Sequence, residues 1–309
     1  MLRTRKLRRM INETERLGRG QLLVALTFDV EREYGSDRLK GNSATASQFL
    51  ASLQDAPENV TIFVEGGLVS ENAEMLRSLQ RRGIEIGLHG HCHELWGQSQ
   101  WYLRDRPLAI EGKSSFLSAG MEAFRNAGLR KPIVFRAPNL VTDASTLRLL
   151  LEKGFRVDSS LPSHKGALPI PQFFGGPEGL VSVPVSADPV PSLSRKGILP
   201  YYRYVVCNLK NLKESRKEEI LRHISRIMGL QQALGVPPHM VILCHSWEFF
   251  NPAINDQDYA YCSPENSQFL RNLNRIISER FSVRRVSMST LGEQFNEKTR
   301  SPSFHASVE

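Results

Sequence analysis

Short apolar runs alternate with helical patterns along most of the chain. Residues 22–28 (Leu-Leu-Val-Ala-Leu-Thr-Phe) and 60–64 (Val-Thr-Ile-Phe-Val) have the continuous apolar character of buried strands. From Ser70 to Arg82 the apolar residues recur at helical spacing, and Gly83 follows where a helix is expected to stop. The same alternation predicts further strands at 84–88, 133–135, 155–157, 180–183, 240–243 and 281–286, and helices at 108–127, 143–153, 215–234 and 263–280.

The interval 159–200 breaks this pattern. It is rich in Pro, Gly and Ser and shows little periodicity, so we predict long loops there around one short strand. Elsewhere the alternation predicts an α/β fold with a parallel sheet, either open or closed into a barrel. Functional sites of such folds lie at the carboxyl ends of strands, so polar residues just after each strand are the first candidates.

The segment 89–93 (His-Gly-His-Cys-His) directly follows the third predicted strand. Neutral imidazole is the commonest ligand for zinc and similar ions. Because His89 and His93 are four residues apart, we expect both on one side of a helical turn, where they can share a metal. His91 cannot share that face and is expected to point elsewhere. The alternative is a His-rich polar loop without metal.

Two carboxylates, Asp29 and Glu31, directly follow the first apolar strand. Strand alternation places both on one face, with Val30 on the other. A third metal ligand is usually a carboxylate, and catalytic sites keep one position open for water. One of the two acids is therefore expected to bind metal and the other to take a proton from water.

Three further polar residues follow later strands: His245, Arg136 and Asp158. His245 is a candidate general acid because the pKa of histidine suits proton transfer near neutral pH. Arg136 and Asp158 are candidates for orienting the acid and the base. Taken singly, each of the three is more often structural, and it is their convergence at strand ends that favours a site.

The charge of the chain is concentrated at its start. The 309 residues carry a formal net charge of +8, and residues 1–20 account for +5 of it. We therefore divide the chain into a basic arm (1–20), a single folded unit (21–297) and a tail (298–309). The arm is expected to make at most a weak contact with a membrane surface, and the folded part has no nucleic-acid-binding signature. The chain has no secretory signal, and its four scattered cysteines form no metal-binding pair, so we expect a cytoplasmic protein.

A collinear series of motifs spans about residues 22–291. They are Thr27-Phe28-Asp29, residues 61–66 (Thr-Ile-Phe-Val-Glu-Gly), residues 85–94 (Glu-Ile-Gly-Leu-His-Gly-His-Cys-His-Glu), residues 135–138 (Phe-Arg-Ala-Pro) and residues 243–245 (Leu-Cys-His). In this order they resemble the motifs of the NodB-type polysaccharide deacetylases, a family of carbohydrate esterases. Residues 245–249 (His-Ser-Trp-Glu-Phe) are similar to a branch of that family associated with exopolysaccharide synthesis.

The resemblance implies a distorted (β/α) barrel with fewer than eight repeats. It also implies hydrolytic removal of N-acetyl or O-acetyl groups from an amino sugar or polysaccharide, with Zn²⁺ or, in its place, Co²⁺, Ni²⁺, Mn²⁺ or Fe²⁺. Carried over by position, His89 and His93 are metal ligands, and Asp29 is the general base for attack by metal-activated water. Arg136 holds that base, His245 is the general acid, and Asp158 tunes His245.

This sequence departs from the family pattern at Val30. The family usually has two adjacent aspartates here, and the second is the metal ligand. We expect Glu31 to supply the carboxylate instead; otherwise Asp29 binds the metal, or the site is inactive. The tryptophan that usually follows the aspartate at Asp158 is also missing.

Substrate contacts are expected from Trp247, Pro138 and Asn139, with a saccharide as the partner. Stacking on sugar rings is a second use for aromatic side chains, although core packing is their commoner fate. The candidates for stacking are Trp96, Trp101, Tyr201, Tyr202 and Trp247.

Two alternative functions stay open at this point. A relative of the same fold cleaves cyclic amides, sometimes without metal, but this chain retains both His89 and His93. A catalytically inactive barrel that only binds saccharide is supported by Val30 and opposed by Asp29, His245 and Arg136.

Overall fold

The computed structural model describes residues 20–32, 43–53, 59–99, 105–161, 169–176, 179–196, 199–251 and 259–299. The basic arm predicted at 1–20 lies outside these ranges except for its last residue, and so does the predicted tail from residue 300. Trp101 and the side chains of Tyr201 and Tyr202 also lie outside the described part of the molecule.

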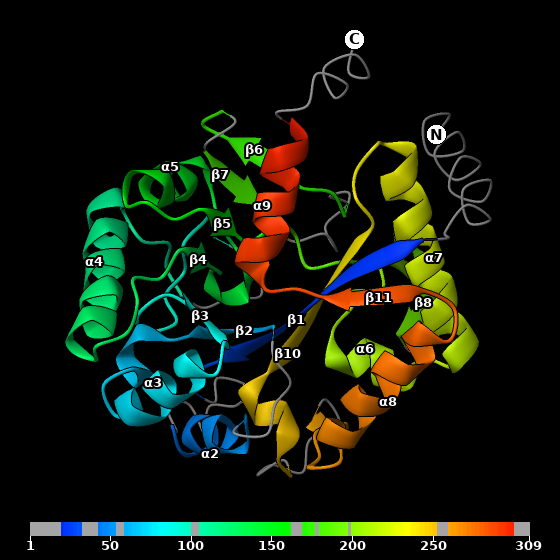
Figure 1. The fold of residues 1–309 in the computed structure, drawn as a ribbon, viewed down its shortest axis with the longest axis horizontal. Helices are drawn as coiled ribbons and strands as arrows, with labels where there is room; N and C mark the ends of the chain where they lie inside the picture. The colour runs from blue at the N-terminus through cyan, green and yellow to red at the C-terminus, as the bar shows by residue number, and fades with distance from the viewer. Residues whose placement is uncertain are drawn as a thin grey trace.

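In the described part of the chain, nine strands form one curled sheet in the order β10-β1-β2-β3-β4-β5-β7-β6, with β11 paired to β1 (Figure 1). All neighbours are parallel except β6 and β7. The strands are β1 (Gln21–Val30), β2 (Val60–Val64), β3 (Glu85–Leu88), β4 (Val134–Phe135), β5 (Val157–Asp158), β6 (Gln172–Phe174), β7 (Leu180–Ser182), β10 (His239–His245) and β11 (Ser282–Arg285).

The sheet closes on itself through irregular backbone between β7 and β10. The N–H of Ser186 donates to the carbonyl of Val241 at 3.1 Å, and the N–H of Cys207 donates to the carbonyl of Ser186 at 2.7 Å. Leu243 on β10 in turn donates to Cys207 at 3.0 Å. The structure therefore confirms the predicted distorted barrel with fewer than eight repeats.

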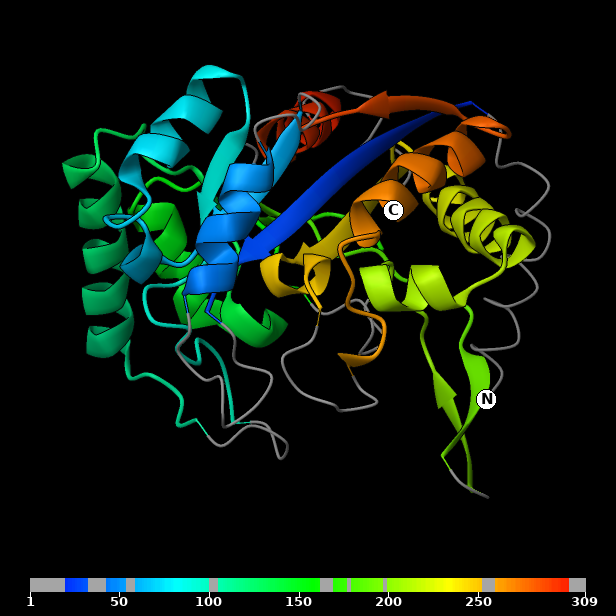
Figure 2. The ribbon, with the colours of Figure 1, turned by 90° about the horizontal axis from the view of Figure 1, so that it is seen from below.

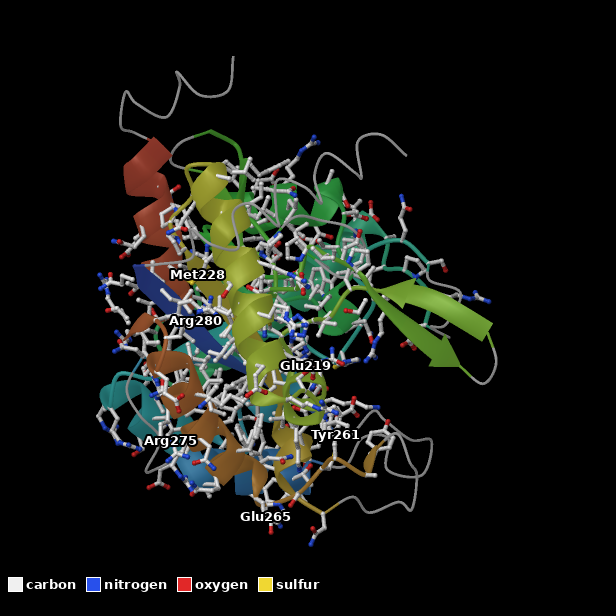
Figure 3. All side chains as sticks on the ribbon, turned by 90° about the vertical axis from the view of Figure 1, so that its right-hand side faces the viewer. Glu219, Met228, Tyr261, Glu265, Arg275 and Arg280 are labelled. Atoms are coloured by element: carbon white, nitrogen blue, oxygen red, sulfur yellow. The ribbon has the colours of Figure 1, made fainter. Side chains whose placement is uncertain are left out.

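Helices surround the sheet (Figures 1 and 2). Those that lie within a predicted helix are α3 (Ala73–Arg81), α4 (Ile110–Asn126), α5 (Ala144–Glu152), α7 (Lys217–Ala233) and α8 (Asn266–Ser278). The sequence did not predict α2 (Ala44–Ser52), α6 (Leu209–Glu214), α9 (Met288–Thr299), or the hairpin of β8 (Ser192–Lys196) and β9 (Leu199–Arg203). Most of the hairpin falls in the interval predicted as loops, and it projects outward from the body of the molecule (Figure 3). Among the described residues, none of the helices is both long and apolar enough to cross a membrane.

The first turn of α9 closes the amino-terminal end of the barrel. The half-buried carboxylate of Glu85 accepts hydrogen bonds from the backbone N–H groups of Met288 and Ser289 at 2.9 and 3.2 Å. It also accepts the hydroxyl of Thr61 at 2.7 Å. A carboxylate at a helix N-terminus satisfies donors that have no partner within the helix. With this end sealed, the opposite end of the barrel is where a ligand has access.

Asp143 ties α4 to α5, and its replacement is expected to destabilise the protein. Its carboxylate caps α5 by accepting the N–H of Thr146 at 2.9 Å, and it accepts the buried ammonium of Lys113 at 2.7 Å. Asp143→Ala removes the cap and leaves a buried cation without its partner, at a cost of about 3 kcal/mol in the free energy of unfolding. Urea unfolding measures this cost, and the Asp143→Ala/Lys113→Met double variant is expected to recover part of it. A loss below about 0.5 kcal/mol contradicts the assigned role.

The contribution of Asp143 to the free energy of unfolding decreases at low pH. Burial raises the pKa of Asp143, but the hydrogen bonds from Lys113, Ser145 and Thr146 outweigh it and lower that pKa to about 2. Because this pKa lies below the unfolded value of about 3.9, the stabilisation is present above pH 4 and is lost as the pH falls toward 2. Its size is reduced by solvent, since this side chain is 31% exposed.

Candidate active site

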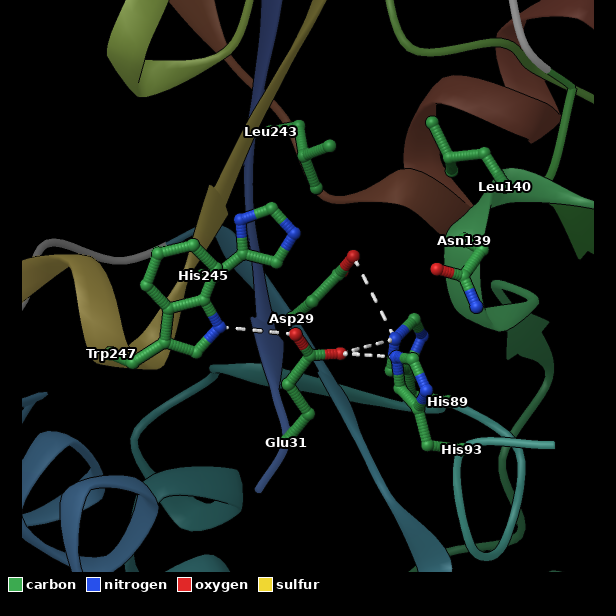
Figure 4. A pocket seen from close by; sticks show the side chains of 9 residues that line it. All are labelled: Asp29, Glu31, His89, His93, Asn139, Leu140, Leu243, His245 and Trp247. Carbon is green, nitrogen blue, oxygen red and sulfur yellow. Dashed lines mark hydrogen bonds and ion pairs between the residues drawn. The ribbon is translucent and has the colours of Figure 1, made fainter. Parts of the chain in front are cut away.

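A cavity of about 220 Å³ lies at the carboxyl ends of β1, β3 and β10 (Figure 4). His245 and Trp247 stand on one side of two carboxylates, and His89 and His93 stand on the other. Its lining is formed by Asp29, Glu31, His89, His93, Asn139, Leu140, Leu243, His245 and Trp247. The position at strand ends is the one predicted from the sequence.

Strand alternation explains why both acids of β1 reach the cavity. Phe28 and Val30 face outward into the apolar layer beneath the helices, where the Phe28 ring packs on Phe49 of α2 at 5.1 Å. Asp29, and Glu31 just beyond the strand, have the opposite orientation, and both are buried at the cavity wall. Val30 therefore leaves the site, and Glu31 supplies the second carboxylate.

In the described part of the chain, one group of residues has the geometry of a metal site: Glu31, His89 and His93. Their ligand atoms lie within 4.8 Å of one another. Glu31 Oε2 is 3.0 Å from Nε2 of His89 and 3.2 Å from Nε2 of His93. The Nδ1 of His89 lies 2.9 Å from the carbonyl of Arg136, so this nitrogen is the donor and Nε2 is left to bind metal. Two imidazole nitrogens and one carboxylate fit the ligand set of a catalytic zinc site.

The carboxylates and the histidines of the site stabilise each other's charged forms. Burial raises the pKa of Glu31, but the nearby His93 and His89 outweigh burial and hold this pKa well below its usual range. Burial lowers the pKa of His89, but Asp29 and Glu31 outweigh burial, so this pKa is higher than that of an ordinary histidine. Glu31 is consequently ionised at neutral pH, as a metal ligand must be.

The loop that carries the histidines is not helical, which corrects the reason given for their proximity. Gly90 and His93 both adopt left-handed backbone conformations, with φ of 65° and 58°. The carboxylate of Glu94 closes the loop by accepting the backbone N–H groups of His91 and Cys92 at 2.8 and 2.6 Å. His89 and His93 therefore meet through a tight turn, with ring centroids 5.9 Å apart.

His91 points away from the cavity, as predicted. Its ring lies 6.2 Å from the ring of Phe116 on α4. It is also close to Gly66, where an added Cβ would stand 2.6 Å from Nδ1 of His91. The lack of a side chain at Gly66 thus gives the imidazole its place outside the site.

Arg136 holds Asp29, as the sequence predicts. The fully buried guanidinium donates to Oδ1 of Asp29 at 2.7 Å, to the hydroxyl of Thr27 at 2.9 Å and to that of Ser159 at 3.0 Å. It also lies 4.2 Å from the ring centroid of Phe63. The other oxygen of Asp29 is 3.9 Å from Nε2 of His89. Asp29 is thus fixed at one oxygen and faces the metal-site residues with the other.

Asp158 does not pair with His245, contrary to the sequence prediction. Its carboxylate accepts the hydroxyls of Ser160 and Ser182, and the hydroxyl of Ser160 in turn accepts the N–H of Ala137 at 2.7 Å. Burial raises the pKa of Asp158 to about 6. Through Ser160, this carboxylate supports the backbone at Ala137, next to Arg136. These contacts give Asp158 a structural role and no contact with His245.

The carboxylate beside His245 is Glu248, which the sequence analysis missed. Glu248 Oε1 is 3.3 Å from Nδ1 of His245. The two residues are three apart in the one-turn helix η5 (Ser246–Phe249), a spacing that would have indicated the contact had this helix been predicted. Trp247 stacks on the His245 ring at 4.8 Å and donates its indole N–H to Oε1 of Glu31 at 3.1 Å.

The predicted substrate contacts divide into those at the cavity wall and those behind it. Trp247 and Asn139 line the cavity, and Asn139 has a left-handed backbone with φ of 58°. Pro138 is buried and is not among the described residues that line the cavity, because its neighbours Asn139 and Leu140 take that place. Trp96 is fully buried against Phe135 at 5.2 Å, so it packs in the core and does not stack on a substrate.

Two histidines and a carboxylate, gathered in one cavity beside an aspartate that Arg136 holds, form the kind of ligand set that catalytic zinc sites use. Residues 18–157 match the family model described as polysaccharide deacetylase. This match covers a little under half of the chain and agrees with the family that the sequence motifs resemble.

One curated protein and one solved structure are similar to parts or most of this chain. A peptidoglycan deacetylase-like protein of Gibberella zeae is 31% identical over 111 residues, which are 36% of this chain and 30% of that protein. This chain thus spans less than a third of the relative it matches. A crystal structure from Mycobacterium smegmatis, provisionally assigned as a polysaccharide deacetylase, superposes with a TM-score of 0.59 at 23% identity, covering 92% of this chain and 93% of that one. It shows that the fold is shared.

Proposed function

We propose that this protein is a metal-dependent hydrolase that removes acetyl groups from an amino sugar or polysaccharide. The observation that carries the proposal is the arrangement in one cavity: the metal-type group of Glu31, His89 and His93 lies beside Asp29, with His245 opposite. The family supplies the acetylated saccharide as the substrate class. Zn²⁺ is the ion that this ligand set suits best, and Co²⁺, Ni²⁺, Mn²⁺ and Fe²⁺ are the alternatives to test.

Each residue has a part that follows from its contacts. Glu31, His89 and His93 hold the metal, which when bound would activate water and polarise the acetyl carbonyl. Asp29 accepts the proton of the attacking water, and the Arg136 guanidinium at 2.7 Å holds this carboxylate in its orientation. His245 donates a proton to the departing nitrogen or oxygen of the sugar.

The charge of His245 suits this donor role. Burial lowers its pKa, but Glu248 above all, together with Glu31 and Asp29, raises that pKa to about 9. His245 is therefore protonated at neutral pH, and the activity that depends on its proton is lost as the pH rises through about 9. An amine leaving group needs such a proton more than an alcohol does, which favours N-acetyl over O-acetyl substrates.

An inactive saccharide-binding barrel loses its main support in this arrangement. Val30 suggested that a carboxylate ligand is missing, but Glu31 stands at the site with its Oε2 within 3.2 Å of both histidines. Retention of Asp29, Arg136 and His245 in one cluster would have no use in such a barrel.

Acetate release tests the proposal directly. The zinc-loaded protein is assayed against N-acetylglucosamine oligomers, O-acetylated xylan oligomers and a cyclic ureide. Release of acetate from an acetylated sugar, with no opening of the ureide, is the expected result. Opening of the ureide alone assigns the cyclic-amide function instead, and no reaction with any of them, at one bound metal per chain, overturns the proposal.

Glu31→Ala separates the two carboxylates. We expect this variant to bind zinc about 10-fold or more weakly and to lose most of its acetate release, because one of three protein ligands is gone. Metal content after dialysis against a competing chelator measures the effect, with Glu74→Ala on exposed α3 as the matched control. Full metal retention in Glu31→Ala would transfer the ligand role to Asp29.

A further inference from the structure

Glu248 is a buried carboxylate directly behind the candidate general acid. Its side chain is 2% exposed, and it is not among the described residues that line the cavity. Helix η5 begins after His245, so the residue three positions on returns over the imidazole. The carboxylate therefore contacts His245 from the protein side, while the cavity lies on the other.

Both oxygens of Glu248 have partners. Oε1 faces Nδ1 of His245 at 3.3 Å and accepts the hydroxyl of Tyr261 at 2.9 Å. Oε2 accepts the backbone N–H of His245 at 2.8 Å. The same residue thus fixes the backbone and the ring of His245. An imidazole whose Nδ1 faces a carboxylate has Nε2 as its other proton-carrying nitrogen.

The backbone of Glu248 is itself held firmly. Its carbonyl accepts the side-chain amide of Asn266 at 2.6 Å and the N–H of Ser263 at 3.1 Å. Lys213 on α6 donates to Asn266 Oδ1 at 2.7 Å and to the carbonyl of Tyr261 at 2.9 Å. Tyr261, labelled in Figure 3, lies on the segment that leads into α8. The backbone of Glu248 is thus held by Asn266 of α8, which Lys213 of α6 holds in turn.

A structural role alone does not explain a charge at this position. Burial of a carboxylate costs several kcal/mol unless a cation accompanies it. Within the described part of the chain, the ion pair recorded for Glu248 is with His245. A glutamine has one acceptor oxygen for the N–H of His245 and the hydroxyl of Tyr261, whereas the carboxylate accepts both and adds a negative charge beside Nδ1 of His245.

The other titratable groups around the pair do not compete for this charge. Burial and Glu248 raise the pKa of Cys262 to about 12 and that of Cys244 well above its usual value, and they also raise the pKa of Tyr261. These three groups stay neutral at the pH of the reaction. From β1, Asp29 and Glu31 act on His245 in the same direction as Glu248.

We propose that Glu248 is a positioning residue of the reaction put forward above, one that aims His245 at the cavity and keeps it cationic as the proton donor. The proposal rests on the proposed deacetylase function. It gives Glu248 the place that the sequence analysis assigned to Asp158.

Glu248→Gln tests the proposal, because it removes the charge and keeps the shape. In the zinc-loaded variant, the alkaline limb of the kcat profile is expected to move from about pH 9 toward the ordinary histidine value of about 6.5. At pH 8.5 kcat falls roughly 10-fold or more, whereas at pH 6 it changes less than about 3-fold, and KM is little altered. Glu248→Asp keeps the charge and is expected to retain much of the alkaline limb.

Two matched variants distinguish charge from packing. Tyr261→Phe removes the neutral partner of Glu248 and is expected to leave the alkaline limb near pH 9. Glu265→Gln removes an exposed acid from the same segment and should not change the profile. An alkaline limb that stays in place in Glu248→Gln, or that moves equally in Tyr261→Phe, overturns the proposal.

A spectroscopic titration keeps this test independent of activity. The imidazole ¹⁵N resonances of His245 are followed against pH in the zinc-loaded wild type, in Glu248→Gln and in Glu248→Asp, with His245→Gln for assignment. Glu248→Gln is expected to lower the titration midpoint of His245, and an unchanged midpoint refutes the inference. If Glu248→Gln does not fold, Glu248→Asp keeps the charge and is expected to hold the midpoint well above the ordinary histidine value of about 6.5, and a midpoint that falls to about 6.5 in this variant refutes the inference instead. Failure of the wild type to release acetate would contradict the proposed function while this midpoint still reports on Glu248.

Discussion

A variant with both His89→Ala and His93→Ala is expected to lose its bound metal and its acetate release together. The two Nε2 atoms stand 3.0 and 3.2 Å from the same oxygen of Glu31, so removing both leaves a lone carboxylate. Loss of the metal's several kcal/mol of transition-state stabilisation corresponds to at least roughly 10³-fold in kcat/KM. Metal analysis by plasma mass spectrometry and acetate release on the same preparation measure both effects.

His91→Ala is the matched control for the double variant. It removes an imidazole from the same loop, but one that packs near Phe116 outside the cavity. We expect it to keep about one metal per chain. Equal metal loss in His91→Ala and in the double variant would show that the loop, and not its two ligands, determines binding.

Asp29→Asn is expected to abolish most of the activity while the metal stays bound. The carboxamide has the size of the carboxylate but cannot accept the proton of the attacking water, so kcat falls by about 10²–10⁴-fold. Arg136 is fully buried and loses its counter-charge, so the free energy of unfolding of the variant is also expected to fall by about 3 kcal/mol. Kinetics, metal content and urea unfolding are compared with those of the wild type.

The metal content of the Asp29→Asn and Glu31→Ala variants decides which of the two carboxylates is the ligand. If Asp29→Asn loses its metal while Glu31→Ala keeps it, Asp29 is the ligand. The 3.9 Å between Oδ2 of Asp29 and Nε2 of His89 is longer than the 3.0 Å to Glu31, which is why we expect metal retention.

Strands with continuous apolar character and helices with clear stops could be predicted from the sequence. The predicted strand at 60–64 coincides with β2, and Gly83 follows α3 as expected. The position of the site followed from the rule that polar residues after parallel strands meet at one edge. These strands and helices could be predicted because the apolar pattern and the stop signals of each lie within its own segment.

The elements that the sequence did not reveal depend on partners distant in the chain. The amino end of α9 is held by Glu85, more than 200 residues earlier. The barrel is closed by backbone contacts from Ser186 and Cys207, which have no pattern of their own. The loop that joins His89 to His93 was predicted from helical spacing, but left-handed backbone at Gly90 and His93 produces the contact instead. Spacing alone does not separate a helical turn from a tight loop.

The residue beside His245 could not be predicted from the sequence either: it is Glu248 and not Asp158. Asp158 was expected beside His245 from the family pattern, and the missing tryptophan after it was a sign that this part of the site differs. Three buried hydroxyl and amide contacts hold Asp158 near Ala137, whereas Glu248 reaches His245 through a single helical turn. A short local contact has taken the place of a long-range one.

Titration of the metal-free protein with zinc tests the central claim most directly. Acetate release from N-acetylglucosamine oligomers is followed as zinc is added in substoichiometric steps. If Glu31, His89 and His93 hold a catalytic metal, the rate rises from near zero in proportion to added zinc and stops rising at one equivalent per chain. A metal-free protein that is already fully active, or one that binds its equivalent of zinc and still releases no acetate, would contradict the account.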